Sequence, residues 1–242
     1  MRSRPLILVL CLGLLHSLAF SRISISQRLS VKSDPPIWSK QAIPFDLSCT
    51  TKTRVIRSPD HRSSVEISCP GVDLVSGDRH FDVPIHYGAN ELLWAPDSHA
   101  FFVNGGTSGY AGFFVTVYVL DAEKDVREVT LTDEAQMDMV KSFPPCKALR
   151  IDRNCGEVAK DPQYNMSGLA WTADSSAIYV FAEVPPSGSY GGIMGQVLGY
   201  ELAVPSGKIQ RRLSAKEVKE QWSKYAAWKV HVPEPPDYDP RK

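Results

Sequence analysis

The sequence lacks an excess of charge of either sign, because it contains 27 basic and 27 acidic residues. Removal of residues 1–21 as a leader would take away Arg2 and Arg4, leaving 25 basic residues against 27 acidic ones. A chain with no basic excess lacks the electrostatic footprint of proteins that bind nucleic acid or rest on anionic membranes. We therefore expect neither to be the main partner.

Long apolar runs are missing except at the N-terminus, so we expect no membrane span in the rest of the chain. There, Arg2 and Arg4 precede an apolar stretch over residues 5–15, and Ser17-Leu18-Ala19 offers small residues for cleavage. This order predicts a secretory signal peptide over residues 1–21. The run is short for a membrane span, and an uncleaved anchor is the alternative. We expect a secreted or periplasmic protein.

Metal-binding spacings are also missing, since the sequence has no Cys-x-x-Cys or His-x-x-x-His pattern. We expect no metal and no cofactor. Four cysteines follow the leader, and an even number in an exported chain predicts disulfides. Three pairings are open, and we favour the two local ones, Cys49 with Cys69 and Cys146 with Cys155.

Recognisable catalytic motifs are scarce. The glycines near Ser108 do not form the Gly-x-Ser-x-Gly elbow of hydrolases. Asp97-Ser98-His99 contains three triad residue types, but a triad needs them to converge in space rather than follow one another on a turn. The sequence leaves enzymatic activity open and favours its absence, with no catalytic residue assigned.

The sequence does contain an internal repeat. The stretch Leu92–Val103 returns without a gap as Leu169–Val180, and about half of the positions are identical. The shared positions include Trp94 with Trp171 and both Asp-Ser pairs. Recurrence of this kind is typical of repeat architectures.

A degenerate third copy lies upstream, where Val55–Asp60 and Ser64–Ile67 repeat the order of strand, Pro-Asp turn and strand. From Asp60 to Asp97 is 37 positions, and from Asp97 to Asp174 is 77. These intervals are roughly one and two units of about 40 residues. We attribute the wider interval to an inserted helix and a cysteine-containing loop.

Each copy is predicted to form a hairpin, because Pro, Asp and Ser favour the turn and the flanking residues favour strands. In the first full copy, Leu92–Ala95 pairs with Ala100–Val103. A Gly-rich loop and two more strands follow in each full copy. The predicted ranges are a loop at 105–112 with strands at 113–120 and 126–131, and a loop at 185–195 with strands at 196–202 and 208–213.

At these residues the chain resembles the WD-repeat and TolB-like β-propeller family, whose blades carry a Trp-x-Pro-Asp-Ser or Ser-Pro-Asp-Gly turn. Leu93–Ser98 fits well, whereas Trp171–Ser175 lacks the Pro and Arg57–Asp60 lacks the Trp. The resemblance implies a mainly β fold of about three antiparallel propeller-like blades. Because complete propellers have four to eight blades, an incomplete propeller, an irregular sandwich and half of a dimeric ring remain open.

Two helices are predicted beside the blades. The first covers 133–143, with Thr132 as N-cap and Pro144 ending it. Its apolar stripe is expected to be core: Ala135, Met139, Val140 and Phe143. The second begins with a capping box at Ser214 and continues to about Trp228, with Val218, Trp222 and Tyr225 on the face that packs on the sheet.

The predicted domain order is signal peptide, flexible N-terminal arm (22–37), β-propeller-like domain (38–230) and disordered tail (231–242). We expect Trp38 and Phe45 to pack on the first blade. Asn165-Met166-Ser167 matches a glycosylation acceptor, although such tripeptides are common by chance and chance is the favoured explanation.

The two Gly-rich loops occupy the same place in both blades and each contains one tyrosine, Tyr110 or Tyr190, a composition familiar from binding surfaces. Together with Phe113 they are the candidate binding residues; a simple connection between strands is the alternative. The predicted function is an exported non-catalytic interaction module for an unknown protein or small molecule. A secreted hydrolase, or an accessory subunit of one, is the alternative. Open sheet edges predict homo-oligomers.

Overall fold

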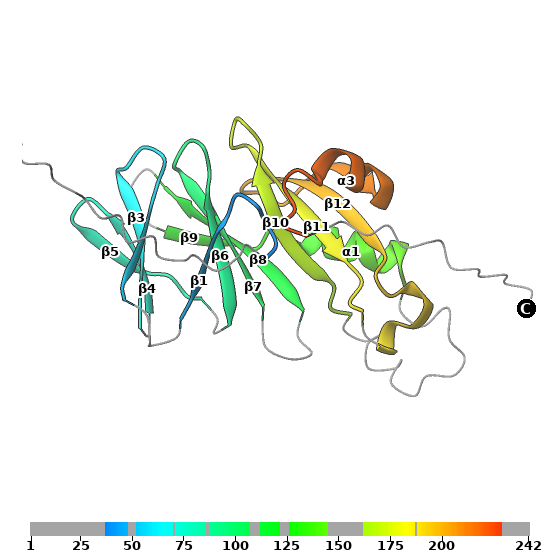
Figure 1. Cartoon of the computed structure of the whole chain (residues 1–242). Coiled ribbons are helices and arrows are strands. Elements are labelled where there is room, and N and C mark those ends of the chain that lie inside the picture. The colour runs from blue at the N-terminus through cyan, green and yellow to red at the C-terminus, as the bar shows by residue number, and fades with distance from the viewer. Residues whose placement is uncertain are drawn as a thin grey trace, which may run out of the picture. The chain divides into compact units, whose positions relative to one another are not determined.

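The computed structural model describes residues 37–47, 52–69, 71–85, 88–106, 112–121, 126–144, 162–186 and 188–228. These residues form a mainly β structure of three antiparallel sheets and two α-helices (Figure 1). The predicted leader, most of the arm and the predicted tail lie outside the described residues.

Sheet 1 is a four-stranded meander in which each strand pairs with the next along the chain. Its strands are β2 (Arg54–Arg57), β3 (Ser63–Ser68), β4 (Gly71–Ser76) and β5 (Arg79–Asp82). The sequence predicted the β2–β3 hairpin, and the register Ile56↔Val65 confirms it. The prediction missed β4 and β5, although the buried positions of β4 alternate as expected for a strand with one face in the core.

Sheet 2 has the order β1-β6-β7-β8-β9. Its strands are β1 (Ile43–Asp46), β6 (Ala89–Trp94), β7 (Ala100–Gly106), β8 (Phe113–Leu120) and β9 (Val126–Val129). The predicted hairpin is confirmed, with Leu92 opposite Val103. Gly105 and Gly106, predicted to begin a loop, instead extend β7, because their backbones pair with β8.

The expectation that Trp38 and Phe45 pack on the first blade holds for Phe45 but not for Trp38. β1 pairs with β6 and so becomes the fifth strand of sheet 2. Phe45 contributes to the core shared by sheets 1 and 2. Trp38 is also buried, but its ring lies 5.1 Å from that of Phe113 in sheet 2.

Sheet 3 is again a four-stranded meander: β10 (Asn165–Trp171), β11 (Ala177–Glu183), β12 (Val197–Ala203) and β13 (Ile209–Ser214). Between β11 and β12, part of the predicted loop forms the 3₁₀-helix η1 (Gly188–Ile193). Trp171 lies opposite Ile178, so the second predicted hairpin is confirmed.

Trp94 and Trp171 occupy equivalent surroundings, as the repeat requires. Each is 7% exposed at the end of the first strand of its hairpin. The Trp94 indole donates to the carbonyl of Ile56 in sheet 1 at 3.3 Å, and that of Trp171 donates to Leu93 in sheet 2 at 3.1 Å. Ile56 and Leu93 are matching positions in successive copies. One hydrogen bond is therefore repeated between successive sheets.

The three hairpin turns are equivalent as well. Positive φ values of 61°, 66° and 61° occur at His61, Ser98 and Ser175. The hydroxyl of Ser98 accepts from the Asp60 backbone N–H at 3.1 Å, and that of Ser175 accepts from Asp97 N–H at the same distance. Each serine thus fastens its own turn to the turn of the preceding copy.

Helix α1 (Asp133–Ser142) begins after Thr132, as predicted, although the Thr132 side chain makes no capping hydrogen bond. Ala135 and Met139 are buried in the core shared by sheets 2 and 3, so the predicted stripe is part of that core. In the same core, Phe102 faces sheet 3. Its neighbour Phe101 faces sheet 1.

Helix α3 (Ala215–Trp222) carries the predicted capping box, in which Ser214 and Glu217 satisfy each other. The helix ends at Trp222 rather than near Trp228. Val218 and Trp222 pack on sheet 3, on the face opposite α1 (Figure 1). Gly199 permits this approach, because a Cβ there would lie 2.5 Å from Val218.

Candidate functional site

Of the two candidate binding residues that the structure describes, Phe113 and Tyr190, only Phe113 is accessible. It begins β8 and is 41% exposed, and its ring packs edge-on against Trp38. Its backbone N–H donates to the Asn165 side-chain oxygen at 3.1 Å, which ties β8 to the start of β10. An exposed aromatic ring on a backbone fixed in this way is a firm platform for a ligand.

A hollow of about 320 Å³ lies next to Phe113. It is formed where the start of β8, the first turns of α1 and the residues before β10 meet. Its lining combines aromatic and apolar walls with amide, hydroxyl and carboxylate groups: Gly112, Phe113, Phe114, Thr132, Asp133, Gln136, Gln163, Tyr164 and Met166. Such a mixture is typical of small ligand-binding sites, where a few polar groups orient an otherwise apolar ligand.

Tyr190 is not exposed, contrary to the sequence-based expectation. It is 7% exposed and its ring lies 5.9 Å from that of Tyr164. Its hydroxyl accepts from the Gln163 N–H at 3.0 Å and donates to the carbonyl of the same residue. Tyr190 therefore braces the wall formed by residues 163 and 164 and does not face a ligand. Burial raises the pKa of the neighbouring Tyr164 to about 12.

The first Gly-rich segment reaches the hollow directly and the second reaches it indirectly. Gly112 and Phe113 line it, whereas Tyr190 holds Gln163 in place. Tyr110, the third candidate binding residue, lies outside the described residues. The two Gly-rich segments thus contribute to one hollow, although the sequence suggested two similar exposed tyrosines.

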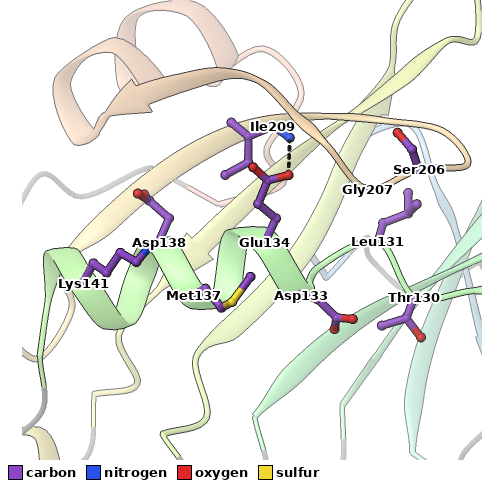
Figure 2. A pocket seen from close by; sticks show the side chains of 10 residues that line it. All are labelled: Thr130, Leu131, Asp133, Glu134, Met137, Asp138, Lys141, Ser206, Gly207 and Ile209. Atoms are coloured by element: carbon purple, nitrogen blue, oxygen red, sulfur yellow. Dashed lines mark hydrogen bonds between the residues drawn. The ribbon is translucent and has the colours of Figure 1, made fainter.

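A second hollow, of about 440 Å³, lies between α1 and the β12–β13 turn (Figure 2). In Figure 2, Glu134 extends from the helix to the hairpin, where its carboxylate accepts from the Ile209 N–H at 3.1 Å. Asp133 points the other way in that view and also lines the hollow beside Phe113. Met137, on the same helix, is 56% exposed. Both hollows therefore share the N-terminal half of α1.

The far end of this second hollow is occupied by a structural network. Asp138 accepts from the Tyr200 hydroxyl and from Arg212 Nε, both at 2.7 Å. Although partial burial acts in the other direction, these two groups together with Lys141 lower the pKa of Asp138. Tyr200 is buried, and burial is the main cause of its raised pKa. The network anchors α1 on sheet 3.

A buried carboxylate holds the N-terminal segment in place. Glu91, on β6, is 0% exposed. It accepts from the consecutive backbone N–H groups of Ile37, Trp38 and Ser39 at 3.1, 3.1 and 2.7 Å, and from Asn104 Nδ2 at 2.7 Å. Burial raises the pKa of Glu91, against the opposing effect of these hydrogen bonds. Since the donors belong to the protein itself, Glu91 acts as a clasp.

The clasp continues to sheet 3. The Asn104 amide donates to the Gly168 carbonyl at 2.7 Å and accepts from the Gly168 N–H at 2.6 Å. The Ser39 hydroxyl donates to the Leu169 carbonyl at 2.7 Å. Three parts of the chain are thereby joined: the N-terminal segment, sheet 2 and the first strand of sheet 3.

Asp97, Ser98 and His99 serve the turn. Asp97 accepts from the His99 backbone N–H at 3.0 Å, and the Ser98 hydroxyl is bonded to the neighbouring turn. Asp174 makes the equivalent contact with the Ser176 N–H at 3.2 Å. The three residues have the turn roles expected for the repeat.

The other predicted residues are covered only in part. Cys69 directly follows β3, while Cys49, Cys146 and Cys155 lie outside the described residues, so the disulfide pairing stays a prediction. Asn165 is 6% exposed, and its amide nitrogen donates to Glu183 at 3.3 Å. Both polar atoms of the Asn165 side chain are therefore engaged within the fold.

The described residues contain neither a metal-binding cluster nor a membrane-spanning helix. Within them, no three His, Cys, Asp or Glu side chains are grouped so as to hold a metal ion. No helix in the same part of the chain is long and apolar enough to cross a membrane. Compared with known proteins, the chain matches no family model and no curated protein.

Proposed function

We propose that this protein is an exported, non-catalytic binding module built from propeller-like blades, and that its ligand binds in the hollow beside Phe113. The observation that carries the proposal is the partly exposed Phe113 ring at the mouth of a mixed apolar and polar hollow. Both Gly-rich segments contribute to this hollow, one by lining it and one through the Tyr190 brace.

The blade interpretation is supported by the repeated contacts between sheets. A tryptophan donates to the preceding sheet twice, from Trp94 and from Trp171, at matching positions. Serine-to-turn bonds repeat in the same way. Four-stranded antiparallel meanders that pack face to face are the building units of propellers.

The ligand class that fits the hollow is a small molecule or a single protruding side chain, since 320 Å³ lies at the low end of ligand pockets. An aromatic or aliphatic group would contact Phe113 and Met166. A polar end would meet Gln136 and Asp133. This arrangement is suited to recognition, because positioned contacts of this kind fix the orientation of a ligand.

A ligand-observed NMR screen of a fragment library against residues 22–242 tests the proposal. We expect hits that lose their saturation-transfer signal in Phe113→Ala and keep it in Val55→Ala, a control with a comparably exposed apolar side chain in sheet 1. Tryptophan fluorescence should change with the same hits, because the Trp38 ring lies 5.1 Å from the Phe113 ring. Hits that are insensitive to Phe113→Ala, or turnover of ester, peptide or glycoside substrates, would overturn the proposal.

Homo-oligomers through open sheet edges remain part of the proposal. The edge of β1 does not support this assembly, because Pro44 has no N–H and its carbonyl accepts from Arg54. The other edge strands of the three sheets are the remaining candidates: β2, β5, β9, β10 and β13. Light scattering of residues 22–242 should give more than one subunit if these edges pair, and a strict monomer would refute it.

A further inference from the structure

Positive charge is concentrated on one part of the described chain. Residues 208–228, which include β13 and α3, contain six basic residues against two acidic ones. Residues 126–144, which include β9 and α1, contain four acidic residues against two basic ones. The balanced total therefore hides a separation of charge.

The two acidic residues of α3 already have partners within the helix. Glu217 forms the capping box with Ser214, and Glu220 lies 3.9 Å from Lys216. Of the six basic residues, Arg212 pairs with Asp138. No carboxylate in the described part of the chain forms a salt bridge with Arg211, Lys219 or Lys224.

Aromatic rings lie among the remaining cations. The Tyr179 ring packs 4.9 Å from Trp222 and 5.6 Å from Tyr225, and Lys224 Nζ lies 4.8 Å from the centre of the Tyr225 ring. Arg211 lies in the same cross-strand row as Tyr179, and its Nη2 donates to Gln221 of α3 at 2.5 Å.

Further charges border the rings. Lys40 adds an ammonium group, which donates to the Ser223 carbonyl at 3.0 Å. Glu201 lies between Tyr179 and Arg211 in the sheet and is the one acid in this row. Tyr179 and Tyr225 are half-buried, so part of each ring remains accessible.

We propose that this basic-aromatic surface, made by Lys40, Tyr179, Arg211, Lys224 and Tyr225, binds an anionic polysaccharide. Sulfate or carboxylate groups would pair with the three cations, and sugar rings would pack on the exposed parts of the tyrosines. The residues of this surface do not line the hollow beside Phe113, so each proposal can be refuted without affecting the other.

The packing of α3 favours a polysaccharide over a lipid bilayer. Membrane-surface helices insert an apolar face into the lipid. In α3 that face is occupied, because Val218 and Trp222 are buried against sheet 3. An acidic polypeptide could satisfy the cations but would not need the tyrosine rings.

The test is salt elution of residues 22–242 from immobilised dextran sulfate, with uncharged dextran as the blank. Lys40→Gln, Arg211→Gln and Lys224→Gln combined should weaken binding about tenfold, since each exposed ionic contact contributes modestly. A matched control removes three exposed cations from sheet 1 and its flanks, as Lys52→Gln, Arg57→Gln and Arg62→Gln. We expect this control to bind like the wild type, and circular dichroism confirms that each variant is folded.

Tyr225→Leu separates the partner classes. It should weaken binding to dextran sulfate and leave binding to polyglutamate unchanged. Equal loss in the sheet 1 control would show nonspecific attraction and overturn the proposal. Tighter binding to polyglutamate or phosphatidylglycerol vesicles than to dextran sulfate would also overturn the proposal. The same holds if Tyr225→Leu leaves binding to dextran sulfate unchanged.

Discussion

Sheets 1 and 3 are both four-stranded meanders, but they differ in what covers the face that points away from sheet 2. Sheet 3 is covered on one side by sheet 2 and α1 and on the other by α3. On sheet 1, the buried core faces sheet 2, and strand β4 alternates between buried and half-buried residues. On the other face, Glu66, Asp73 and Asp82 lie opposite one another across three strands.

The two ends of this row of similar sheets are therefore finished in different ways. One end is covered by an amphipathic helix. The other ends in a polar face with three acids in line, which resists packing by a further apolar sheet, because burying unpaired charge is costly.

The largest effect is expected at the covered end. Trp222, which is 3% exposed, fills the space between α3 and sheet 3. Trp222→Ala should lower the free energy of unfolding by about 3–5 kcal/mol, as large-to-small core changes do. Val55→Ser on sheet 1 provides the comparison and should change stability by less than about 0.5 kcal/mol. Urea denaturation measures both; similar costs would contradict the contrast.

The next effect concerns the Glu91 clasp, which holds the N-terminal segment beside the residues that follow α3. Glu91→Gln keeps the size of the side chain but replaces an acceptor oxygen with an NH₂ group. Donors among Ile37, Trp38 and Ser39 then lose their acceptor, at a cost of about 1–3 kcal/mol. Denaturation of the variant gives the value, and a gain in stability would refute the role as clasp.

The pH dependence of the same variant has a defined sign. Burial raises the folded-state pKa of Glu91 above its ordinary value of 4.5. A carboxyl group with a raised pKa stabilises the fold fully below its unfolded-state pKa and loses that contribution as pH rises through the folded-state value. The stability of wild type minus Glu91→Gln should therefore fall as pH increases from about 4 upward. A difference that grows with pH would mean that the four hydrogen bonds outweigh burial.

A smaller effect tests whether the two joints between sheets are alike. Trp94→Phe and Trp171→Phe each remove one indole hydrogen bond to the preceding sheet. Each should cost about 1 kcal/mol from this bond, with a similar additional loss of packing in both. Differential scanning calorimetry compares them, and a cost several times larger in one variant would show that the two joints differ.

The smallest effect lies on the uncovered face. Asp73 stands between two other acids, and like charges directly opposite each other in a sheet are unfavourable. Asp73→Asn should stabilise the protein by about 0.2–1 kcal/mol at low salt, and the gain should shrink at high salt. A loss of stability would indicate that Asp73 has a structural partner.

The sequence supported the hairpins, both helices and the equivalence of the tryptophans, because turn residues, caps and apolar periodicity are local signals. It did not reveal β4 and β5, although Val72, Leu74 and Ser76 follow the two-residue period. Strand β1 could not be predicted, since its place depends on Glu91, which is distant along the chain.

The candidate site was predictable only in part. The Gly-rich neighbourhood of Phe113 predicts it as a candidate binding residue. The same signal predicts an exposed Tyr190, but the Tyr190 ring packs on Tyr164 and its hydroxyl bonds to Gln163. Composition shows that a loop is rich in glycine and tyrosine; it does not show which way a ring turns.

The bridge between Ser39 and Ala226 has a practical consequence. The Ala227 N–H donates to the Trp38 carbonyl at 2.8 Å, and the Lys40 N–H donates to the Tyr225 carbonyl at 2.7 Å, so positions nearly 190 apart in sequence are neighbours. A short linker joining these two segments would permit circular permutation, with new ends placed at the exposed turn near Asp174. A partner protein fused before residue 38 and one fused after residue 228 would be attached to neighbouring points of the domain.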